Sequence, residues 1–254
     1  TTSPTSDSES TFFFVAYSDV ESGQAPDKHA EIINEGILDF FDQPDGAIID
    51  QMLAFCLVPG DLVGSDHGAS DWREGFFGQA ENLIRHVPLI PAIGSGDASS
   101  SRYLDYMNLP VNGSPGHEEQ WYWFDRQNLR IITLDSNAGD HQDLQLDWLD
   151  AVLADAAVTE QIDFVLLQLH HPCLSESWPE GQSDFACQAV TRVAEFSSSS
   201  GKPSVHFHGR SHSYSRGHAR DHRHVMINTA SAMGDLDYWY ARTNVDHDEI
   251  LFTE

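Results

Sequence analysis

The sequence predicts an α/β fold built around a largely parallel β-sheet. Short apolar runs that are typical of strands alternate with longer segments in which apolar residues recur at helical spacing. Polar residues follow directly after several of the strand-like runs. Strands and helices that alternate in this way favour a layered fold in which helices connect neighbouring parallel strands.

Strands and helices are expected in turn along the chain. The strand-like runs cover 12–17, 52–58, 89–93, 120–125, 129–134, 162–169, 204–207 and 225–228. Helical periodicity covers 32–41, 72–84, 144–153 and 189–196, and the last of these helices is ended by a serine run and Gly201. No internal repeat or linker divides these segments, so they are expected to share one core.

The chain of 254 residues is long enough to bury one substantial core. Residues 1–11 are rich in Ser, Thr and acidic residues, which predicts a disordered linker, and residues 12–254 are expected to form one domain. The sequence stops at 250–254 within a strand-like pattern. We therefore expect the domain to be truncated at its C-terminus and the chain to be part of a longer one.

The charge is strongly acidic. Asp and Glu number 40 against 13 Lys and Arg, which gives a net charge of −27, and the only lysines are Lys28 and Lys202. A field of this sign repels nucleic acid and anionic membrane surfaces, so neither is expected as a partner. An acidic surface is also typical of halophilic proteins, because counterions screen its self-repulsion. No run approaches the roughly 18–20 apolar residues of a membrane span, so membrane insertion is not expected.

The three cysteines do not form a metal-binding or redox motif. The absence of a Cys-x-x-Cys pair excludes a zinc ribbon and a thioredoxin-type site. Cys56 lies in an apolar run and is expected in the core. Cys173 and Cys187 lie in loop-like sequence, where they either form a disulfide or remain free thiols.

The polar residues after the strands predict a single site. Asp19, Asp61, His170 and His212 lie at or shortly after strand ends, and a further group of this kind is formed by residues 95–97. Loops at the carboxyl ends of strands in an open α/β sheet converge on one crevice. We therefore expect the two carboxylates and the two imidazoles to lie close together, where they can bind a metal ion.

The order of these residues resembles that of the calcineurin-like metallophosphoesterases. The matching motifs are Ser18-Asp19, Gly60-Asp61-Leu62-Val63, Gly94-Ser95-Gly96-Asp97, His170-His171-Pro172 and Gly209-Arg210-Ser211-His212. The resemblance runs from about Phe12 to about Trp239. It is closest to the purple-acid-phosphatase-like branch, because the last motif continues as His-x-Tyr-x-Arg to Arg216. The resemblance implies a metallophosphoesterase-type sandwich, with two facing mixed β-sheets flanked by α-helices.

The resemblance also implies roles for four residues. Asp19 and His212 would bind a first metal ion, His170 a second, and Asp61 would bridge the two. Carboxylates and imidazoles suit Mn, Fe or Zn. Two such ions activate a shared water and stabilise the phosphoryl oxygens during hydrolysis of a phosphoric ester.

Several positions depart from the family pattern. Ser95 and Gly96 stand where the family has a metal-binding Asn and a substrate-facing His. Arg210 replaces a His ligand of the second metal, Glu21 stands where His or Gln is common, and Gly64 replaces the tyrosine that colours purple acid phosphatases. Because a guanidinium does not lose its proton in proteins, Arg210 disfavours a cation at the second position.

These substitutions predict one bound metal ion or none, rather than two. The metal-binding candidates are Asp19, Glu21, Asp61, Ser95, His170 and His212, and the ion is Mn, Fe or Zn, with Ca a further possibility. The catalytic candidates are Asp61, His171 and Arg210. Arg210 is expected to point into the second metal position, with Asp61 or a bound anion as its partner.

Two functions remain open from the sequence. The first is a weakened phosphoric ester hydrolase that acts on a phosphoester small molecule or binds an anion. The second is a non-catalytic pseudoenzyme, a binding or structural domain of a larger extracellular protein. An extracellular or periplasmic location is expected in either case. If the first holds, the joint changes Ser95→Asn, Gly96→His and Arg210→His are expected to raise metal content and hydrolysis.

Two further readings are less favoured. A Ser–His hydrolase centred on Ser95 would need a base oriented by a third group, and the spacing identifies none. The His-rich segment, with His206, His208, His222 and His224, offers pairs on single strand faces for a secondary metal site. Ordinary strand and turn histidines explain that segment better.

Overall fold

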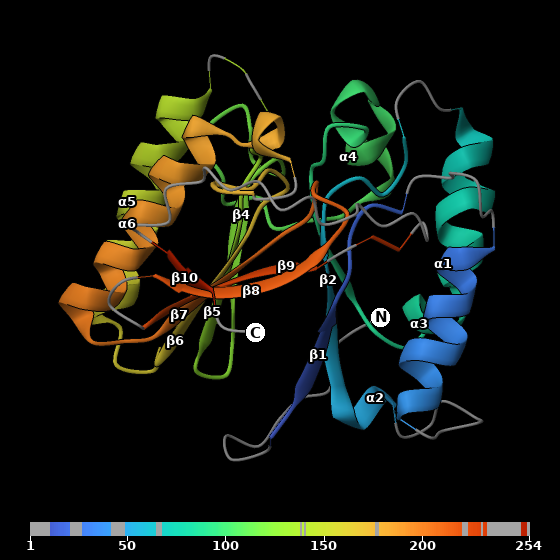
Figure 1. Cartoon of the computed structure of the whole chain (residues 1–254), viewed down its shortest axis with the longest axis horizontal. Helices are drawn as coiled ribbons and strands as arrows, with labels where there is room; N and C mark the ends of the chain where they lie inside the picture. Colours follow the sequence, from blue (N-terminus) through green and yellow to red (C-terminus); the bar gives the residue numbers. More distant parts are fainter. Residues whose placement is uncertain are drawn as a thin grey trace.

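Two β-sheets lie face to face between two layers of helices (Figure 1). The structure is a computed structural model that describes residues 11–20, 27–41, 49–64, 68–137, 139, 141–175, 178–219, 223–229, 231–232 and 250–252. Most of the predicted linker, residues 1–11, lies outside the described residues, as does Glu21. The α/β class and the sandwich of two sheets flanked by helices are confirmed.

The smaller sheet has the order β1-β2-β3, and its strands pair in parallel. The strands are β1 (Phe13–Ala16), β2 (Leu53–Pro59) and β3 (Leu89–Ala92). Every residue of β2 is buried, because helices cover one face of this sheet and the larger sheet covers the other. The ends of β1 and β2 therefore reach the site from the middle of the molecule.

The larger sheet has the order β10-β8-β9-β7-β6-β5-β4. Its strands are β4 (Tyr122–Arg126), β5 (Leu129–Thr133), β6 (Phe164–Gln168), β7 (Ser204–His208), β8 (Tyr214–Ala219), β9 (His224–Thr229) and β10 (Ile250–Phe252). Strands β5, β6, β7 and β9 run parallel, whereas β4, β8 and β10 pair antiparallel with their neighbours. This sheet is therefore mixed.

Helices cover the outer face of each sheet (Figure 1). On the side of the smaller sheet lie α1 (Lys28–Glu31), α2 (Ile49–Met52), α3 (Gly78–Ile84) and two π-helical segments, Ile32–Leu38 and Asp71–Phe77. On the side of the larger sheet lie α5 (Gln142–Val158) and α6 (Asp184–Ser200). Shorter pieces are the 3-10 turns Asp97–Ser99 and Pro179–Gly181 and helix α4 (Arg102–Tyr106).

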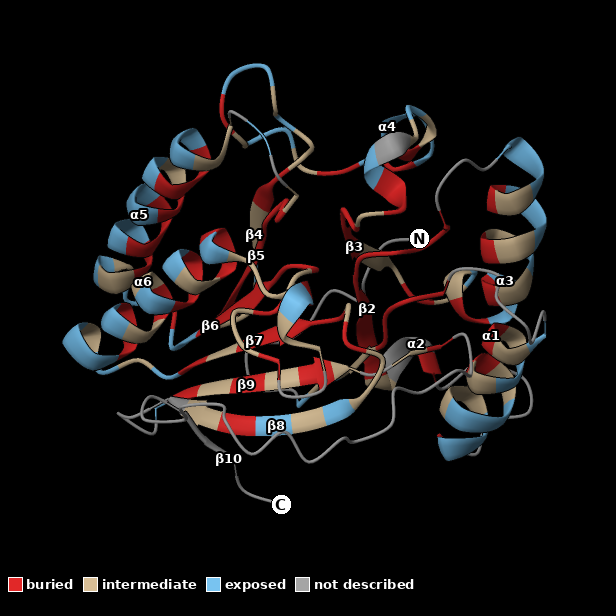
Figure 2. Ribbon diagram, turned by 45° about the horizontal axis from the view of Figure 1, so that its top comes forward, coloured by how far each residue is buried: buried red, intermediate tan, exposed pale blue. Residues whose placement is uncertain are grey.

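The hydrophobic core has three layers, and burial follows the helix–sheet boundaries (Figure 2). Between the sheets, Phe55 and Leu57 of β2 pack with Ile131, Leu166 and Phe207 of the larger sheet. Full burial of such a side chain contributes about 1.5–3 kcal/mol. This middle layer fixes the two sheets against each other and so fixes the relative positions of their strand ends.

The predicted strands match the observed ones within one or two residues at nearly all ends. The elements that the sequence did not predict include β8 and the short helices α2 and α4. The segment of β8 was interpreted as motif and His-rich sequence, because its histidine, arginine and glycine residues hide the strand pattern. Helix α4 is too short to show a helical period.

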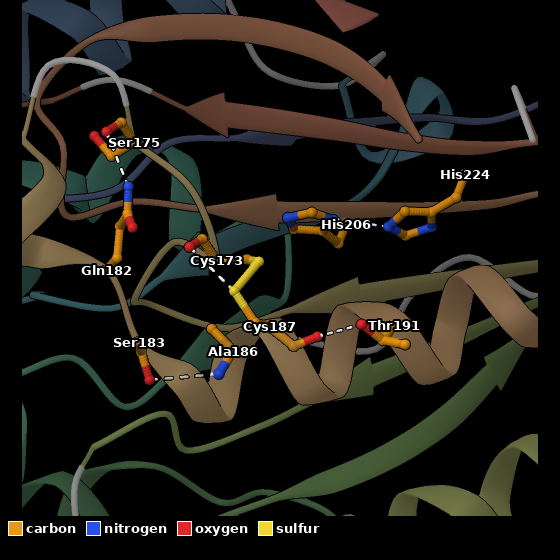
Figure 3. Close-up of a disulfide and its surroundings, with 9 residues drawn as sticks. All are labelled: Cys173, Ser175, Gln182, Ser183, Ala186, Cys187, Thr191, His206 and His224. Carbon is orange, nitrogen blue, oxygen red and sulfur yellow. Dashed lines mark hydrogen bonds between the residues drawn. A yellow bond between two sulfur atoms is a disulfide. The ribbon is translucent and has the colours of Figure 1, made fainter. Parts of the chain in front are cut away.

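A disulfide joins Cys173 to Cys187, with 14 residues of separation (Figure 3). The alternative that the sequence left open is therefore settled in favour of a bond, while Cys56 is a buried free thiol, as predicted. In the part of the chain that the structure describes, no helix has the length and apolar character to cross a membrane.

Buried histidines of β7 and β9 contact one another. Nδ1 of His206 lies 2.9 Å from Nε2 of His224, whose Nδ1 lies 2.7 Å from Ser204 Oγ (Figure 3). His208 stacks on His206 with ring centroids 5.5 Å apart. His222 lies outside the described residues. The polar atoms of this pair thus face each other between strands, as expected of structural histidines.

The net charge of −27 predicts that salt stabilises the fold. Raising NaCl from about 0.1 M to about 1 M shortens the screening length from about 10 Å to about 3 Å, which weakens repulsion between surface carboxylates. We expect the melting temperature to rise by several degrees across this range. A thermal unfolding series at constant pH measures it. A melting temperature that falls with added salt would contradict the interpretation of the charge as surface self-repulsion.

The buried His29 predicts acid sensitivity. Burial lowers its pKa from 6.5 to about 4, and its Nε2 lies 3.1 Å from the Tyr17 hydroxyl. The unfolded state therefore binds a proton first as the pH falls below 6.5, which costs the fold about 2 kcal/mol at pH 5 relative to pH 7. In His29→Gln this component of the pH dependence should vanish. Urea unfolding of wild type and His29→Gln at pH 5 and pH 7 measures the free energy of unfolding. An equal loss of this free energy between the two pH values in both proteins would contradict the prediction.

Candidate metal centre

Three loops that carry predicted site residues leave their strands in the left-handed backbone conformation. Asp19, after β1, has a φ of 55°, Asp61, after β2, has 52°, and Arg210, after β7, has 71°. This conformation costs a residue other than glycine about 1–3 kcal/mol and persists only where the surrounding contacts hold it. Backbone strain of this kind is concentrated at functional sites. Three strained residues at neighbouring strand ends therefore mark this edge as a site.

Asp19 is buried and receives several hydrogen bonds. Ser18 Oγ donates to its Oδ2 at 2.6 Å, and the backbone N–H of Arg210 lies 3.2 and 3.0 Å from its two oxygens. Nε2 of His212 lies 3.6 Å from Oδ1. The loop after β7 thus closes onto the end of β1, and it brings His212 to the carboxylate with which the resemblance pairs it.

Asp61 and His170 form a buried charged pair. Nε2 of His170 lies 3.2 Å from Oδ2 of Asp61, and Nδ1 of His170 lies 2.9 Å from the Pro59 carbonyl oxygen. Burial lowers the pKa of His170, but the charge and hydrogen bonding of Asp61, together with the charge of Asp19 and the Pro59 carbonyl, outweigh burial and raise the pKa to about 9. Burial likewise raises the pKa of Asp61, but His170 and the Gly96 N–H outweigh it and hold the pKa well below its ordinary range.

The residues fit a metal ion. Asp19, Asp61 and His170 each place one ligand atom within 4.8 Å of the others, and no other group of this kind occurs among the described residues. The buried Nε2 of His170 has no hydrogen-bond partner of normal geometry there. Two carboxylates and an imidazole nitrogen suit Mn, Fe or Zn. The predicted convergence of Asp19, Asp61, His170 and His212 is therefore observed.

The guanidinium of Arg210 lies on the Asp61 side of the centre. Its Nη1 donates to Ser95 Oγ, which lies 3.2 Å from both carboxylate oxygens of Asp61. Its charge contributes to lowering the pKa of Asp61 and of His171. The sequence predicted Asp61 or an anion as the partner of Arg210. The described partner is instead Ser95, which stands one hydrogen bond away from Asp61.

Three solved structures share this arrangement of sheets and helices. A purple acid phosphatase from yellow lupin (Lupinus luteus) seeds matches 94% of this chain with a TM-score of 0.65 at 15% identity. GAP50, the anchor in the inner membrane complex of Plasmodium, matches 94% with a TM-score of 0.57 at 12% identity. A putative 5'-nucleotidase from Staphylococcus aureus matches 86% with a TM-score of 0.50 at 14% identity. The chain has the calcineurin-like metallophosphoesterase fold.

Matches at the level of sequence are shorter. An uncharacterised protein of Mycobacterium tuberculosis, found in two strains, is 28% identical over 147 residues, which cover 48% of this chain and 27% of that protein. This chain also spans 47% of the lupin enzyme, 76% of GAP50 and 48% of the nucleotidase. No protein-family model matches it. The chain therefore corresponds to only part of most of these relatives.

The loop after β3, residues 94–97, which corresponds to the third motif of the resemblance, packs closely against Asp61. The N–H of Gly96 donates to Asp61 Oδ1 at 2.7 Å. A Cβ atom on Gly96 would lie 2.2 Å from the Val63 carbonyl oxygen and 3.1 Å from Gly64. A histidine at this position would require the backbone of one loop to move. The Gly96→His change of the triple variant would therefore have to displace a loop, and the effect of that variant stays a prediction.

Asp97 links the loop after β2 to the loop after β3. Its carboxylate accepts hydrogen bonds from the N–H groups of Leu62 at 3.0 Å, Val63 at 3.1 Å and Gly94 at 2.9 Å. Burial and the charge of Asp61 nevertheless raise the pKa of Asp97 to about 7. Its role here is to hold the loop that presents Asp61.

His171, whose ring centroid lies 5.1 Å from that of His170, is held by Ser136. Nδ1 of His171 lies 2.9 Å from Ser136 Oγ, which also accepts the backbone N–H of His171 at 2.9 Å. Burial, with the charges of His170 and Arg210, lowers the pKa of His171 to about 3. This imidazole is therefore neutral at ordinary pH and fixed in direction. Its catalytic role remains a prediction, as does metal binding by Ser95 and by Glu21, which lies outside the described residues.

One residue of the site was not found from the sequence. The guanidinium of Arg210 lies over the ring of Trp178, 4.8 Å from its centroid. The sequence feature that could have pointed to Trp178 is its place in a Pro- and Gly-containing loop between Cys173 and Cys187, which follows the His-His-Pro motif. No motif of the family marks this position, so only the contact reveals it.

Close packing at Gly96 predicts that Gly96→Ala destabilises the protein. The new methyl group overlaps a backbone oxygen, and overpacking of this kind costs about 1–3 kcal/mol. Gly75→Ala is the matched control, because a Cβ there meets no atom within 4 Å. Urea unfolding measures both variants. A Gly96→Ala protein as stable as wild type would show that the two loops separate easily.

Proposed function

We propose that this chain carries a metal-dependent phosphoric ester hydrolase site that works with one metal ion. The observation that supports it best is the buried group formed by Asp19, Asp61 and His170 at the strand ends of a metallophosphoesterase fold. His212 beside Asp19 completes a plausible ligand set. The substrate class is a phosphoester small molecule, in keeping with the phosphatase and nucleotidase relatives.

The residues around this group have separate roles in the proposed hydrolysis. An ion bound there supplies a water activated for attack on phosphorus. Arg210 offers a fixed positive charge and a fork of N–H donors to the phosphoryl oxygens, as guanidinium groups do for phosphate. Ser95 fixes the direction of that guanidinium. Neutral His171 is held by Ser136 through Nδ1, which leaves Nε2 as the ring nitrogen proposed to meet the substrate.

The count of one ion follows from charge. Arg210 stands where the family has a ligand of the second metal, and its guanidinium lies one hydrogen bond from Asp61. A second cation would have to share that carboxylate with a charge that cannot be lost. With one ion instead of two, less positive charge stabilises the phosphoryl oxygens. We therefore propose that hydrolysis is slow.

The disulfide and the acidic composition support an extracellular or periplasmic location. A disulfide such as Cys173–Cys187 forms and persists in oxidising compartments. The chain spans 27% of its M. tuberculosis relatives and 47% of the lupin enzyme, so membership of a larger protein is part of the proposal. The acidic surface fits a salty medium.

A second candidate function is a non-catalytic binding or structural domain. The presence of Arg210 in place of a ligand favours it. One structural relative, GAP50, is described as an anchor in a membrane complex rather than as an enzyme. Under this alternative the same residues would bind an anion without hydrolysing it.

Metal analysis together with an ester assay tests the proposal. Wild type should bind one equivalent of Mn, Zn or Fe and hydrolyse nitrophenyl phosphate or bis-nitrophenyl phosphate below about 1 s⁻¹, the low end for enzymes. Asp61→Asn should weaken metal binding at least about 10-fold to 100-fold, since even outer partners of ligands cost that much. Asp147→Asn, on the exposed face of α5, is the control. Folded wild-type protein without metal or turnover would instead support the non-catalytic domain.

A double variant tests the account of the second position. Ser95→Asn with Arg210→His returns two family ligands and leaves Gly96 unchanged, so the backbone conflict is avoided. We expect the metal content to rise from one equivalent toward two, measured by elemental analysis. Arg210→His alone should have a smaller effect, because only one ligand returns. A wild type that already holds two ions would contradict the role given to Arg210.

A further inference from the structure

The disulfide closes a short loop beside the site. Cys173 follows the His170-His171-Pro172 motif, and Cys187 lies in the first turn of α6, so the bond encloses residues 174–186 (Figure 3). The helix end is itself fixed, because Ser183 Oγ accepts the N–H of Ala186. One end of the loop is therefore tied to a metal-binding motif and the other to a rigid helix.

Inside this loop Ser175 and Trp178 are held in place. Ser175 Oγ accepts the N–H of Trp178 at 3.1 Å, and the Ser175 carbonyl oxygen accepts Nε2 of Gln182 at 3.1 Å (Figure 3 shows the second bond). The indole packs directly on Gly181, where a Cβ would lie 2.6 Å from a ring carbon. The ring therefore has little freedom to turn.

The loop contacts the segment after β7 at two points. The ring of Trp178 lies under the guanidinium of Arg210, 4.8 Å from centroid to Cζ, a normal cation–π distance. Ser211 Oγ donates to Ser175 Oγ at 2.8 Å. The disulfide-closed loop thus braces both the side chain of Arg210 and the backbone next to it.

Arg210 needs such a brace. Its backbone has a φ of 71°, and its side chain has Ser95 as a partner at Nη1, while the buried Nε has no hydrogen-bond partner among the described residues. A long charged side chain on a strained residue loses its direction unless something fixes it. The Trp178 ring supplies a flat support that fits the planar guanidinium.

We propose that Trp178 is the positioning residue of a phosphate-binding Arg210, and that the Cys173–Cys187 disulfide holds Trp178 in place for this role. This inference rests on the proposed function, in which Arg210 binds the phosphoryl oxygens. The ring keeps the guanidinium beside Ser95 and Asp61, so the donors of Arg210 other than the buried Nε keep one direction for binding an incoming anion. The disulfide thereby acts on affinity for the anion and not only on stability.

Binding of inorganic phosphate to chelator-treated protein tests this directly, because no metal ion or turnover enters the measurement. Titration calorimetry compares wild type with Trp178→Leu, which keeps an apolar side chain but removes the aromatic face, and with Trp178→Phe, which retains a ring. We expect the dissociation constant to rise about 3-fold to 30-fold in Trp178→Leu. Trp178→Phe should recover most of the affinity. Trp148→Leu, a tryptophan change on α5, should leave it unchanged.

The double variant Cys173→Ser/Cys187→Ser tests the covalent part. It should weaken phosphate binding in the same direction as Trp178→Leu, and adding Trp178→Leu to it should cost little more. Thermal unfolding screens every variant, and only proteins folded at the assay temperature are compared. Should the double variant unfold, the Trp178→Leu and Trp178→Phe pair still decides the role of the ring.

Each other result counts against a specific step. Equal affinity in Trp178→Leu and wild type would overturn the positioning role, even where Arg210→Gln abolishes binding. Equal weakening in Trp178→Leu and Trp178→Phe would show a packing role and overturn the role of the aromatic face. Phosphate binding that survives Arg210→Gln would overturn the inference as a whole. The metal and ester assays report on the proposed function separately, so a hydrolase with an unbraced Arg210 would be recognised as such.

Discussion

The charge of two buried carboxylates, Asp19 and Asp61, must be compensated inside the fold, and the arrangement of the site depends on this constraint. In a chain with a net charge of −27, the surface supplies no positive field to help. A buried ion without partners costs several kcal/mol. His170 lies 3.2 Å from Asp61, and Arg210 reaches Asp19 through its backbone and Asp61 through Ser95. Five loops are therefore held at one point, three of them by residues in strained backbone.

The two compensating groups behave differently toward a metal ion. His170 carries a proton that a cation can replace, so metal binding should release this proton and strengthen as the pH rises toward the value of about 9 that Asp61 induces. Arg210 carries a proton that nothing replaces. His170 can therefore give up its proton to a cation, whereas Arg210 keeps its positive charge when a cation binds. This asymmetry is the physical reason for assigning one ion and for giving Arg210 the anion.

The strands and the motif loops could be predicted from the sequence, because apolar runs and the residues that follow them are local signals. Asp19, Asp61, His170 and His212 converge as expected from their places at strand ends. Three features needed coordinates. The strand β8 is masked by polar residues, the contact of Trp178 with Arg210 joins residues far apart in sequence, and the crowding at Gly96 depends on a neighbouring loop. Periodicity carries no information about such long-range contacts.

The crowding at Gly96 bears on how this site relates to a two-metal one. Without a side chain at this position, the third loop approaches the Val63 carbonyl oxygen closely, and the Gly96 N–H binds Asp61 directly. Asp97 then fastens both loops through three N–H groups. The loss of the family histidine is therefore accompanied by a backbone arrangement that leaves no room for it. A histidine at position 96 would require the loops to separate and Asp61 to lose a hydrogen bond.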